Sequence, residues 1–108
     1  MNEKLEKEII AYSKNWFDER NSIEPIKKIM DKYLNYGQIE FLDDEVICLL
    51  MDLLDKHSAF DKIDKVNMEA FIFNYVLFED RSNRDSANVT AGIVRWALRT
   101  LYCACKET

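Results

Sequence analysis

Residues 87–106, ANVTAGIVRWALRTLYCACK, decide the fold that this sequence predicts. When successive residues are placed about 100° apart, as in an α-helix, apolar or small side chains cover more than half of the circumference. A helix with this pattern is packed by neighbours on most sides. We therefore predict that residues 87–106 form a central helix, with Ala91, Ala97 and Ala104 letting its neighbours approach closely.

Four further helical patterns precede this segment and supply those neighbours. Pro25 falls in the first turn of the second pattern, and Gly37 follows that pattern as a stop signal. Asp43 is the expected N-cap of the third. The chain has only two glycines and one proline, too few turn residues for an all-β fold. We predict a single all-α domain over residues 1–108, a compact bundle of about five helices, with the first four at residues 2–20, 23–36, 43–56 and 65–80.

The run Phe71–Phe78, FIFNYVLF, is apolar all round except for Asn74. Its β-propensity also fits a buried strand. We prefer a helix, because residues 39–41 are the only candidate partner strand and are very short. Core packing is expected for Phe71, Phe73 and Phe78 of this run. The polar joint before this helix, residues 57–64, offers Ser58 and Asp64 as caps.

Composition indicates a soluble protein of the cytoplasm. Hydrophobic residues make up 48% of the chain and charged residues 32%. No apolar run approaches the roughly 18 residues of a membrane span, and the charged N-terminus lacks the apolar region of a secretory signal. Three cysteines, an odd number, give no disulfide framework, and free thiols fit a reducing compartment.

The net charge of −5 is distributed unevenly along the chain. Residues 1–36 are neutral, residues 37–80 carry a net charge of −8, and residues 81–108 carry +3. An acidic chain of this kind is poorly suited to bind nucleic acid directly. It fits a basic protein partner better, or pairing between its own acidic and basic parts.

The acidic charge gathers on one side of the helix predicted at residues 43–56. Asp44, Glu45, Asp52 and Asp55 lie opposite a wide apolar arc. Cys48 lies among them, where negative charge disfavours a thiolate. We interpret these four carboxylates as a partner-binding face, and we expect all three cysteines to be buried or inert.

The basic charge forms an arc on the helix predicted at residues 87–106. Arg95, Arg99, Tyr102 and Lys106 share this arc, and arginine suits recognition of carboxylate or phosphate groups. Three interpretations remain open. The arc pairs with carboxylates of the third or fourth helix, forms a protein interface, or contacts nucleic acid, the last being disfavoured by the overall charge.

The sequence contains no phosphate-binding loop, dinucleotide-binding motif, zinc-protease motif or nucleophile elbow. His57 is the only histidine and has no nucleophile nearby in sequence. Two D-x-x-D pairs are similar in spacing to the carboxylate pairs of all-helical nucleotide pyrophosphatases, but the paired glutamates of those enzymes are missing. We expect no metal or cofactor. A magnesium-dependent hydrolase is kept as an alternative, with Asp52, Asp55, Asp61, Asp64 and Glu69 as its candidate residues.

The favoured hypothesis is a non-catalytic protein that docks its acidic face on a basic, nucleic-acid-binding protein. Toxin-immunity proteins and phage-encoded anti-CRISPR inhibitors are analogous in size and charge, though not in motif. The alternative is a self-associating structural module or small subunit of a larger assembly. In its homodimeric form, the acidic helix at residues 43–56 would face the basic helix at 87–106 of a second copy.

Overall fold

The helices observed are those that the hydrophobic spacing predicts. The computed structural model describes residues 3–15, 24–34, 43–80 and 87–106. Within these ranges the all-α prediction is confirmed, and residues 16–20, predicted to extend the first helix, lie outside them. The described elements are α1 (Glu3–Lys14), α2 (Glu24–Leu34), α3 (Asp43–Lys56), the 3-10 helix η2 (Ala59–Asp61), α4 (Lys65–Glu79) and α5 (Ala87–Cys105).

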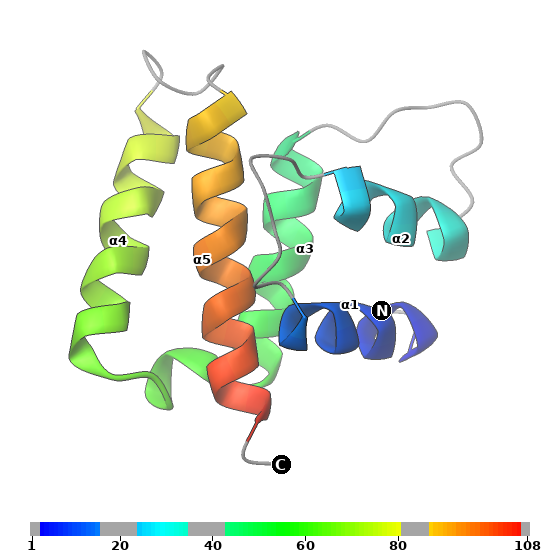
Figure 1. Cartoon of the computed structure of the whole chain (residues 1–108), viewed down its shortest axis with the longest axis horizontal. Helices are drawn as coiled ribbons and strands as arrows, with labels where there is room; N and C mark the ends of the chain where they lie inside the picture. Colours follow the sequence, from blue (N-terminus) through cyan, green and yellow to red (C-terminus); the bar gives the residue numbers. More distant parts are fainter. Residues whose placement is uncertain (1–2, 16–23, 35–42, 81–86, 107–108) are drawn as a thin grey trace.

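The helix α5 is the one around which the others assemble, as its sequence predicts. It packs against α1, α3, α4 and η2, and Figure 1 shows it between α4 on one side and α3 on the other. Leu98 and Leu101 are completely buried. The small side chains of Ala91, Ala97 and Ala104 are almost completely buried. Small residues at such contacts bring helix axes closer together. No helix in the described ranges is both long and apolar enough to cross a bilayer.

The helices α1 and α2 run across the upright α3, α4 and α5 (Figure 1). α1 packs on both α2 and α5. Ile9 of α1 and Ile26 of α2 belong to the same buried cluster as the interior of α5. On the outside, Lys32 Nζ donates to Glu8 Oε2 at 3.2 Å. That pair is partly exposed and contributes little to stability.

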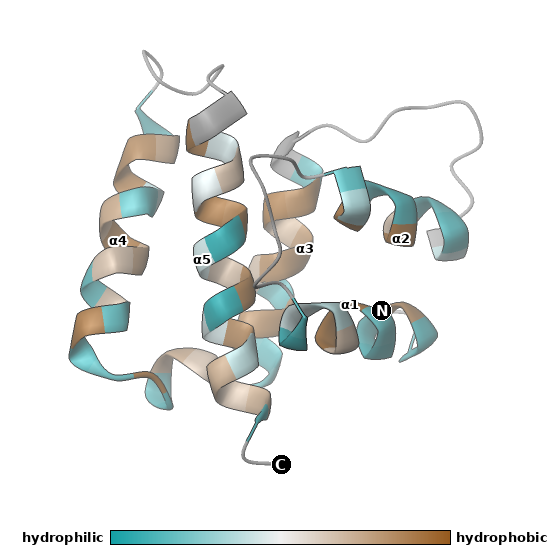
Figure 2. Cartoon of the chain, viewed as in Figure 1, coloured by the Kyte–Doolittle hydropathy of each residue, from teal (hydrophilic) through white to brown (hydrophobic). Residues whose placement is uncertain are grey.

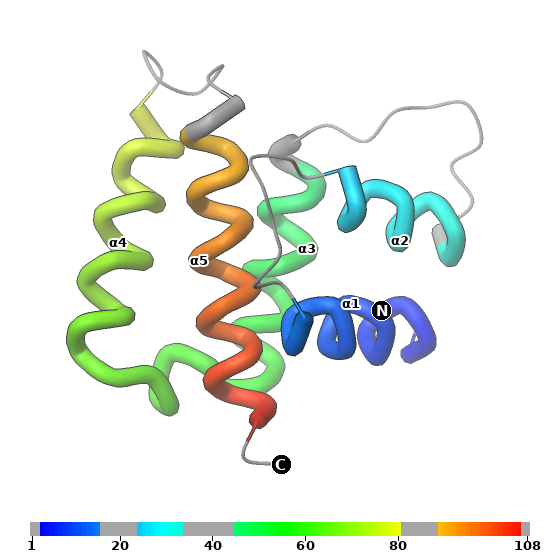
Figure 3. The backbone as a smooth tube through the Cα atoms, in the orientation of Figure 1, coloured from blue at the N-terminus to red at the C-terminus, as the bar shows by residue number. Residues whose placement is uncertain are grey.

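A short joint carries the chain from α3 to α4 past the lower end of α5 (Figure 3). Ser58 occupies the N-cap position of η2 with a φ of 51°, but its side chain makes no cap hydrogen bond. Its N–H donates to the carbonyl of Asp55 at 3.0 Å, at the end of α3, and its own carbonyl accepts from the N–H of Asp61 at 3.1 Å, at the start of η2. Asp64 is an N-cap as predicted, since its Oδ1 accepts from the N–H of Asn67 at 2.8 Å.

The apolar run Phe71–Phe78 lies within α4, which excludes the strand alternative. Phe71 and Phe78 are buried, and Phe71 packs edge-on against Phe60 with ring centroids 5.3 Å apart. The expectation of core packing is wrong for Phe73, which is 64% exposed. α4 packs along one side on α5 and leaves Phe73 on its exposed outer side, although Figure 2 shows hydrophobic residues along most of its length.

Candidate protein-binding surface

The acidic face predicted on α3 is open to solvent in the described part of the helix. Glu45, Asp52 and Asp55 are all exposed. Asp44 belongs to the same helix, but its side chain lies outside the described residues. Asp52 and Asp55 form no ion pair with any described side chain. We call Glu45, Asp52 and Asp55 the acidic α3 face, whose two aspartates can pair with basic groups of a partner.

An apolar groove of about 340 Å³ borders this face, between α3 and α4. Its lining is mostly apolar, with one carboxylate contributed by each helix. Burial, together with the charge of Glu79, raises the pKa of the Tyr75 hydroxyl on its wall. The groove is lined by Ile47, Cys48, Met51 and Asp52 from α3 and by Tyr75, Phe78 and Glu79 from α4. We call the groove and the acidic α3 face together the α3–α4 surface.

The three thiols differ in their access to solvent. Cys105 is buried, and burial raises the pKa of its thiol, as expected for an inert side chain. Cys103 is half-buried. Cys48 is exposed at the groove, so for this thiol the expectation of a buried or inert side chain is left with inertness, which stays a prediction. Cys48 lies on the solvent-exposed side of α3, together with Asp52 and Asp55, so no neighbouring helix covers it.

The arginine Arg99 of the basic arc is engaged within the bundle. Its Nε donates to Asn67 Oδ1 of α4 at 3.2 Å, and its guanidinium lies 6.0 Å from the ring centroid of Trp96. The backbone N–H of Asn67 lowers the pKa of Asp64, and the charge of Arg99 adds to that effect. Of the three interpretations of the arc, internal pairing with α4 therefore has a direct contact, although the acceptor is an amide and not the carboxylate we expected.

The other residues of the basic arc do not form one exposed surface with Arg99. Arg95 and Tyr102 are half-buried, whereas Lys106 is exposed at the end of α5. Lys106 Nζ lies 5.8 Å from the ring centroid of Tyr102. The predicted arc thus divides into three half-buried residues, of which Arg99 contacts α4, and the exposed Lys106 at the end of α5.

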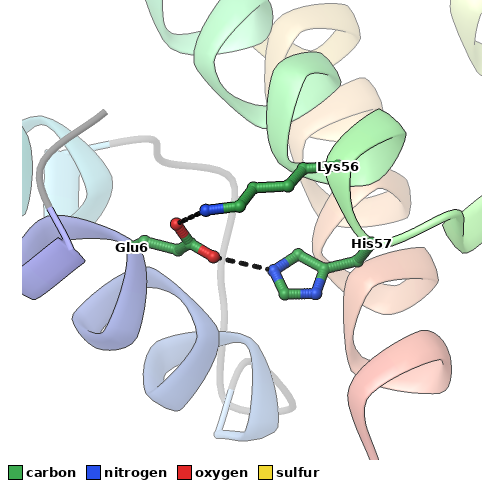
Figure 4. A network of polar contacts seen from close by, with 3 residues as sticks. All are labelled: Glu6, Lys56 and His57. Atoms are coloured by element: carbon green, nitrogen blue, oxygen red, sulfur yellow. Dashed lines mark hydrogen bonds and ion pairs between the residues drawn. The ribbon is translucent and has the colours of Figure 1, made fainter.

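A polar cluster that the sequence analysis missed joins α1 to the end of α3 (Figure 4). The side chain of Glu6 is only 11% exposed. Lys56 Nζ donates to its Oε2 at 2.6 Å, and His57 Nε2 lies 2.9 Å from its Oε1. The hydrogen bond from Lys56 lowers the pKa of Glu6 against the opposing effect of burial, and His57 assists. Because an ionised carboxylate only accepts, His57 Nε2 carries the hydrogen of this contact.

The signal for this cluster was present in the helical spacing of α1. At 100° per residue, Glu6 falls between Ile9 and Ile10 and therefore within the apolar arc. A carboxylate at such a position needs hydrogen-bond donors and a nearby positive charge, which here come from His57 and Lys56. The cluster fastens α1 to the bundle and gives His57 a structural contact.

The carboxylates of the two D-x-x-D pairs are not gathered around one point. Asp52 and Asp55 are exposed on α3, and Asp64 caps α4. Among the described residues, no three His, Cys, Asp or Glu side chains approach closely enough to hold a metal ion. The hydrolase alternative therefore stays a prediction without an identified site.

Comparison with family models, with curated proteins and with solved structures finds no significant match to this chain. Inference about function consequently rests on the chemistry of the α3–α4 surface. That surface combines negative charge with an apolar groove, the two features that a docking site for a basic protein segment requires.

Proposed function

We propose that this protein acts without catalysis of its own, by binding another protein on the α3–α4 surface. The observation that supports the proposal is the position of the acidic α3 face beside an apolar groove. Apolar contact supplies affinity on desolvation, and the surrounding carboxylates supply orientation and choice of partner. Asp52 belongs to both features, since it lines the groove and is exposed on the helix.

The partner is expected to present a helical segment with an apolar ridge and basic edges. An amphipathic helix places side chains into a groove at positions three and four residues apart. Lysine or arginine beside that ridge would meet Asp52 from α3 and Glu79 from α4. Basic helices of this kind are common on nucleic-acid-binding proteins. An inhibitor or immunity-type protein that covers such a surface is the role we favour.

The test compares partner recovery from the source cell by charge-reversed variants. Asp52→Lys/Asp55→Lys reverses two of the four carboxylates of the α3–α4 surface at exposed positions, where we expect the fold to be retained. Glu3→Lys/Asp31→Lys is the matched control, because both residues are exposed on α1 and α2 and it changes the net charge equally. Each variant is immobilised, and bound proteins are quantified by mass spectrometry at low and high salt.

We expect one basic protein to be recovered by the parent and control chains. Its affinity for the α3 variant should be at least about tenfold lower, and raising the salt should weaken the parent complex through screening. A partner that binds the α3 variant as tightly as the parent would contradict the proposal. Equal loss of binding in the control would contradict it too, because the effect would then reflect net charge alone.

A further inference from the structure

The described residues contain four exposed large hydrophobic side chains, and all of them belong to α4. The exposed fraction is 75% for Val66, 51% for Ile72, 64% for Phe73 and 60% for Val76. At helical spacing these four residues share one side of α4. We call them the apolar α4 face. Figure 1 shows α4 at the edge of the bundle, with α5 on one side and no described helix on the other.

This face is a convex ridge that needs a partner of a particular shape. Isolated apolar residues on a surface are ordinary, but several gathered on one side of a helix mark an interaction site. The exposed Glu69 lies on the same side, between Val66 and Phe73, and its Oε1 is 4.0 Å from Lys65 Nζ. The ridge of one helix packs well into the groove beside the ridge of another helix. Phe73 and Ile72 lie at the middle of α4, so a second α4 centred on the same point would cover the whole face.

The charges at the ends of α4 specify how a second copy would lie. Lys65 begins the helix, and Glu79 and Asp80 end it. All three are exposed. An antiparallel pair of α4 helices brings Lys65 of one copy to Asp80 of the partner subunit at both ends, and it opposes the helix dipoles favourably. A parallel pair would instead place like charges together.

We infer that α4 of one copy packs antiparallel on α4 of a second copy, forming a twofold dimer centred on Ile72 and Phe73. A twofold interface uses the same patch on both subunits, which this self-complementary charge pattern allows. The dimer does not depend on the proposed partner-binding function, because the four residues of the apolar α4 face are not part of the groove lining. It also differs from the α3-to-α5 association considered from the sequence.

The test is sedimentation of the full chain across the micromolar range. A reducing buffer excludes a disulfide through the exposed Cys48. We expect a reversible, concentration-dependent dimer, and Phe73→Glu should weaken self-association by about 100-fold or more. Ala11→Glu, which adds the same charge at an exposed position on α1, should leave the dimer unchanged. Circular dichroism checks that both variants keep their helices.

A charge exchange tests the antiparallel arrangement. Lys65→Glu alone and Asp80→Lys alone should each weaken the dimer, and the double variant should recover the parent dissociation constant. A chain that stays monomeric across the range, or a dimer that tolerates Phe73→Glu, would overturn the inference. So would a dimer unaffected by Lys65→Glu. In the first two cases the apolar α4 face would not be the dimer interface, and in the third the two α4 helices would not lie antiparallel. The α3 variants would still test the proposed function separately.

Discussion

Glu6 carries a negative charge in a place that water barely reaches. Removing a carboxylate from water is costly, and the cost is offset only when its oxygens are hydrogen-bonded and a positive charge is close. Lys56 and His57 meet both requirements, one on each oxygen. Because Lys56 and His57 lie at the end of α3, their contacts with Glu6 hold α1 in position against α3.

Stability should depend on pH through Glu6 in a definite direction. The pKa of Glu6 is lower in the folded chain than its ordinary value, so the stability it contributes is present above the unfolded-state pKa. That contribution is lost as the pH falls through the folded-state pKa. We expect Glu6→Gln to reduce the free energy of unfolding by on the order of 1 kcal/mol at neutral pH and by progressively less in acid.

Urea unfolding at several pH values measures this difference. Glu3→Gln, at an exposed position on the same helix, serves as the control and should show little change at any pH. A loss of stability in Glu6→Gln that is the same at pH 3 and pH 7 would mean that the ionised carboxylate is not what stabilises the contact.

At the scale of elements, α4 and α5 are held together by a close approach at Gly92. A Cβ added there would lie 3.0 Å from Oδ1 of Asn74 on α4. The side-chain amide of Asn74 is fixed in this position, because its Nδ2 donates to the carbonyl of Ala70 at 2.8 Å. Glycine inside a helix lowers helix propensity, so its presence in α5 is explained by the space that Asn74 occupies.

A double-mutant cycle should reveal this coupling. Gly92→Ala gains up to about 1 kcal/mol of helix propensity, but the contact with Asn74 should make the substitution destabilising by about 1 kcal/mol net. In an Asn74→Ala background the contact is gone, and Gly92→Ala should become neutral or stabilising. Urea unfolding of the four chains gives the coupling energy. Additive effects would show that the two residues do not constrain each other.

Helix positions were predictable because caps and polar faces mark them in the sequence. Asp64 and the alternation of apolar and charged residues fixed α3, α4 and the joint between them to within a residue or two. The side of α4 that faces the core was not predictable. Because α4 has no polar stripe to mark its solvent-exposed side, the sequence does not show that Phe71 is buried and Phe73 is exposed. Hydrophobic spacing predicts that a helix forms. Which side of the helix is buried can be predicted only when apolar and polar residues lie on opposite sides.

The candidate site, too, was predictable only in part. The acidic α3 face could be predicted, since its carboxylates recur at helical spacing on one element. The groove could not be, because it exists only through the placement of α4 beside α3, and no sequence pattern reports the distance between helices. The contact of Arg99 with Asn67 is another product of that placement.

At the scale of the whole molecule, stability depends on the interior of α5. Leu98 is completely buried in the helix that contacts α1, α3, α4 and η2. Truncating such a residue loses its transfer free energy and leaves a cavity. Small domains are stable by only about 5–15 kcal/mol, so one change at the centre removes a large share.

Leu98→Ala should therefore lower the free energy of unfolding by about 2–5 kcal/mol. Ile72→Ala provides the comparison, because it removes a similar aliphatic side chain that is 51% exposed on α4. In dilute solution, where self-association is absent, it should cost less than about 1 kcal/mol. Thermal and urea unfolding measure both. Equal losses at the two positions would contradict the central role of α5.

The central helix is also the last of the described elements that the ribosome makes. Until residues 87–105 are available, the sides of α1, α3 and α4 that pack on α5 lack the surface that buries them. The nascent chain therefore cannot complete its core step by step from the N-terminus, as multidomain proteins do. We therefore expect the core to be completed only when α5 docks, with the apolar inner sides of the earlier helices exposed until then.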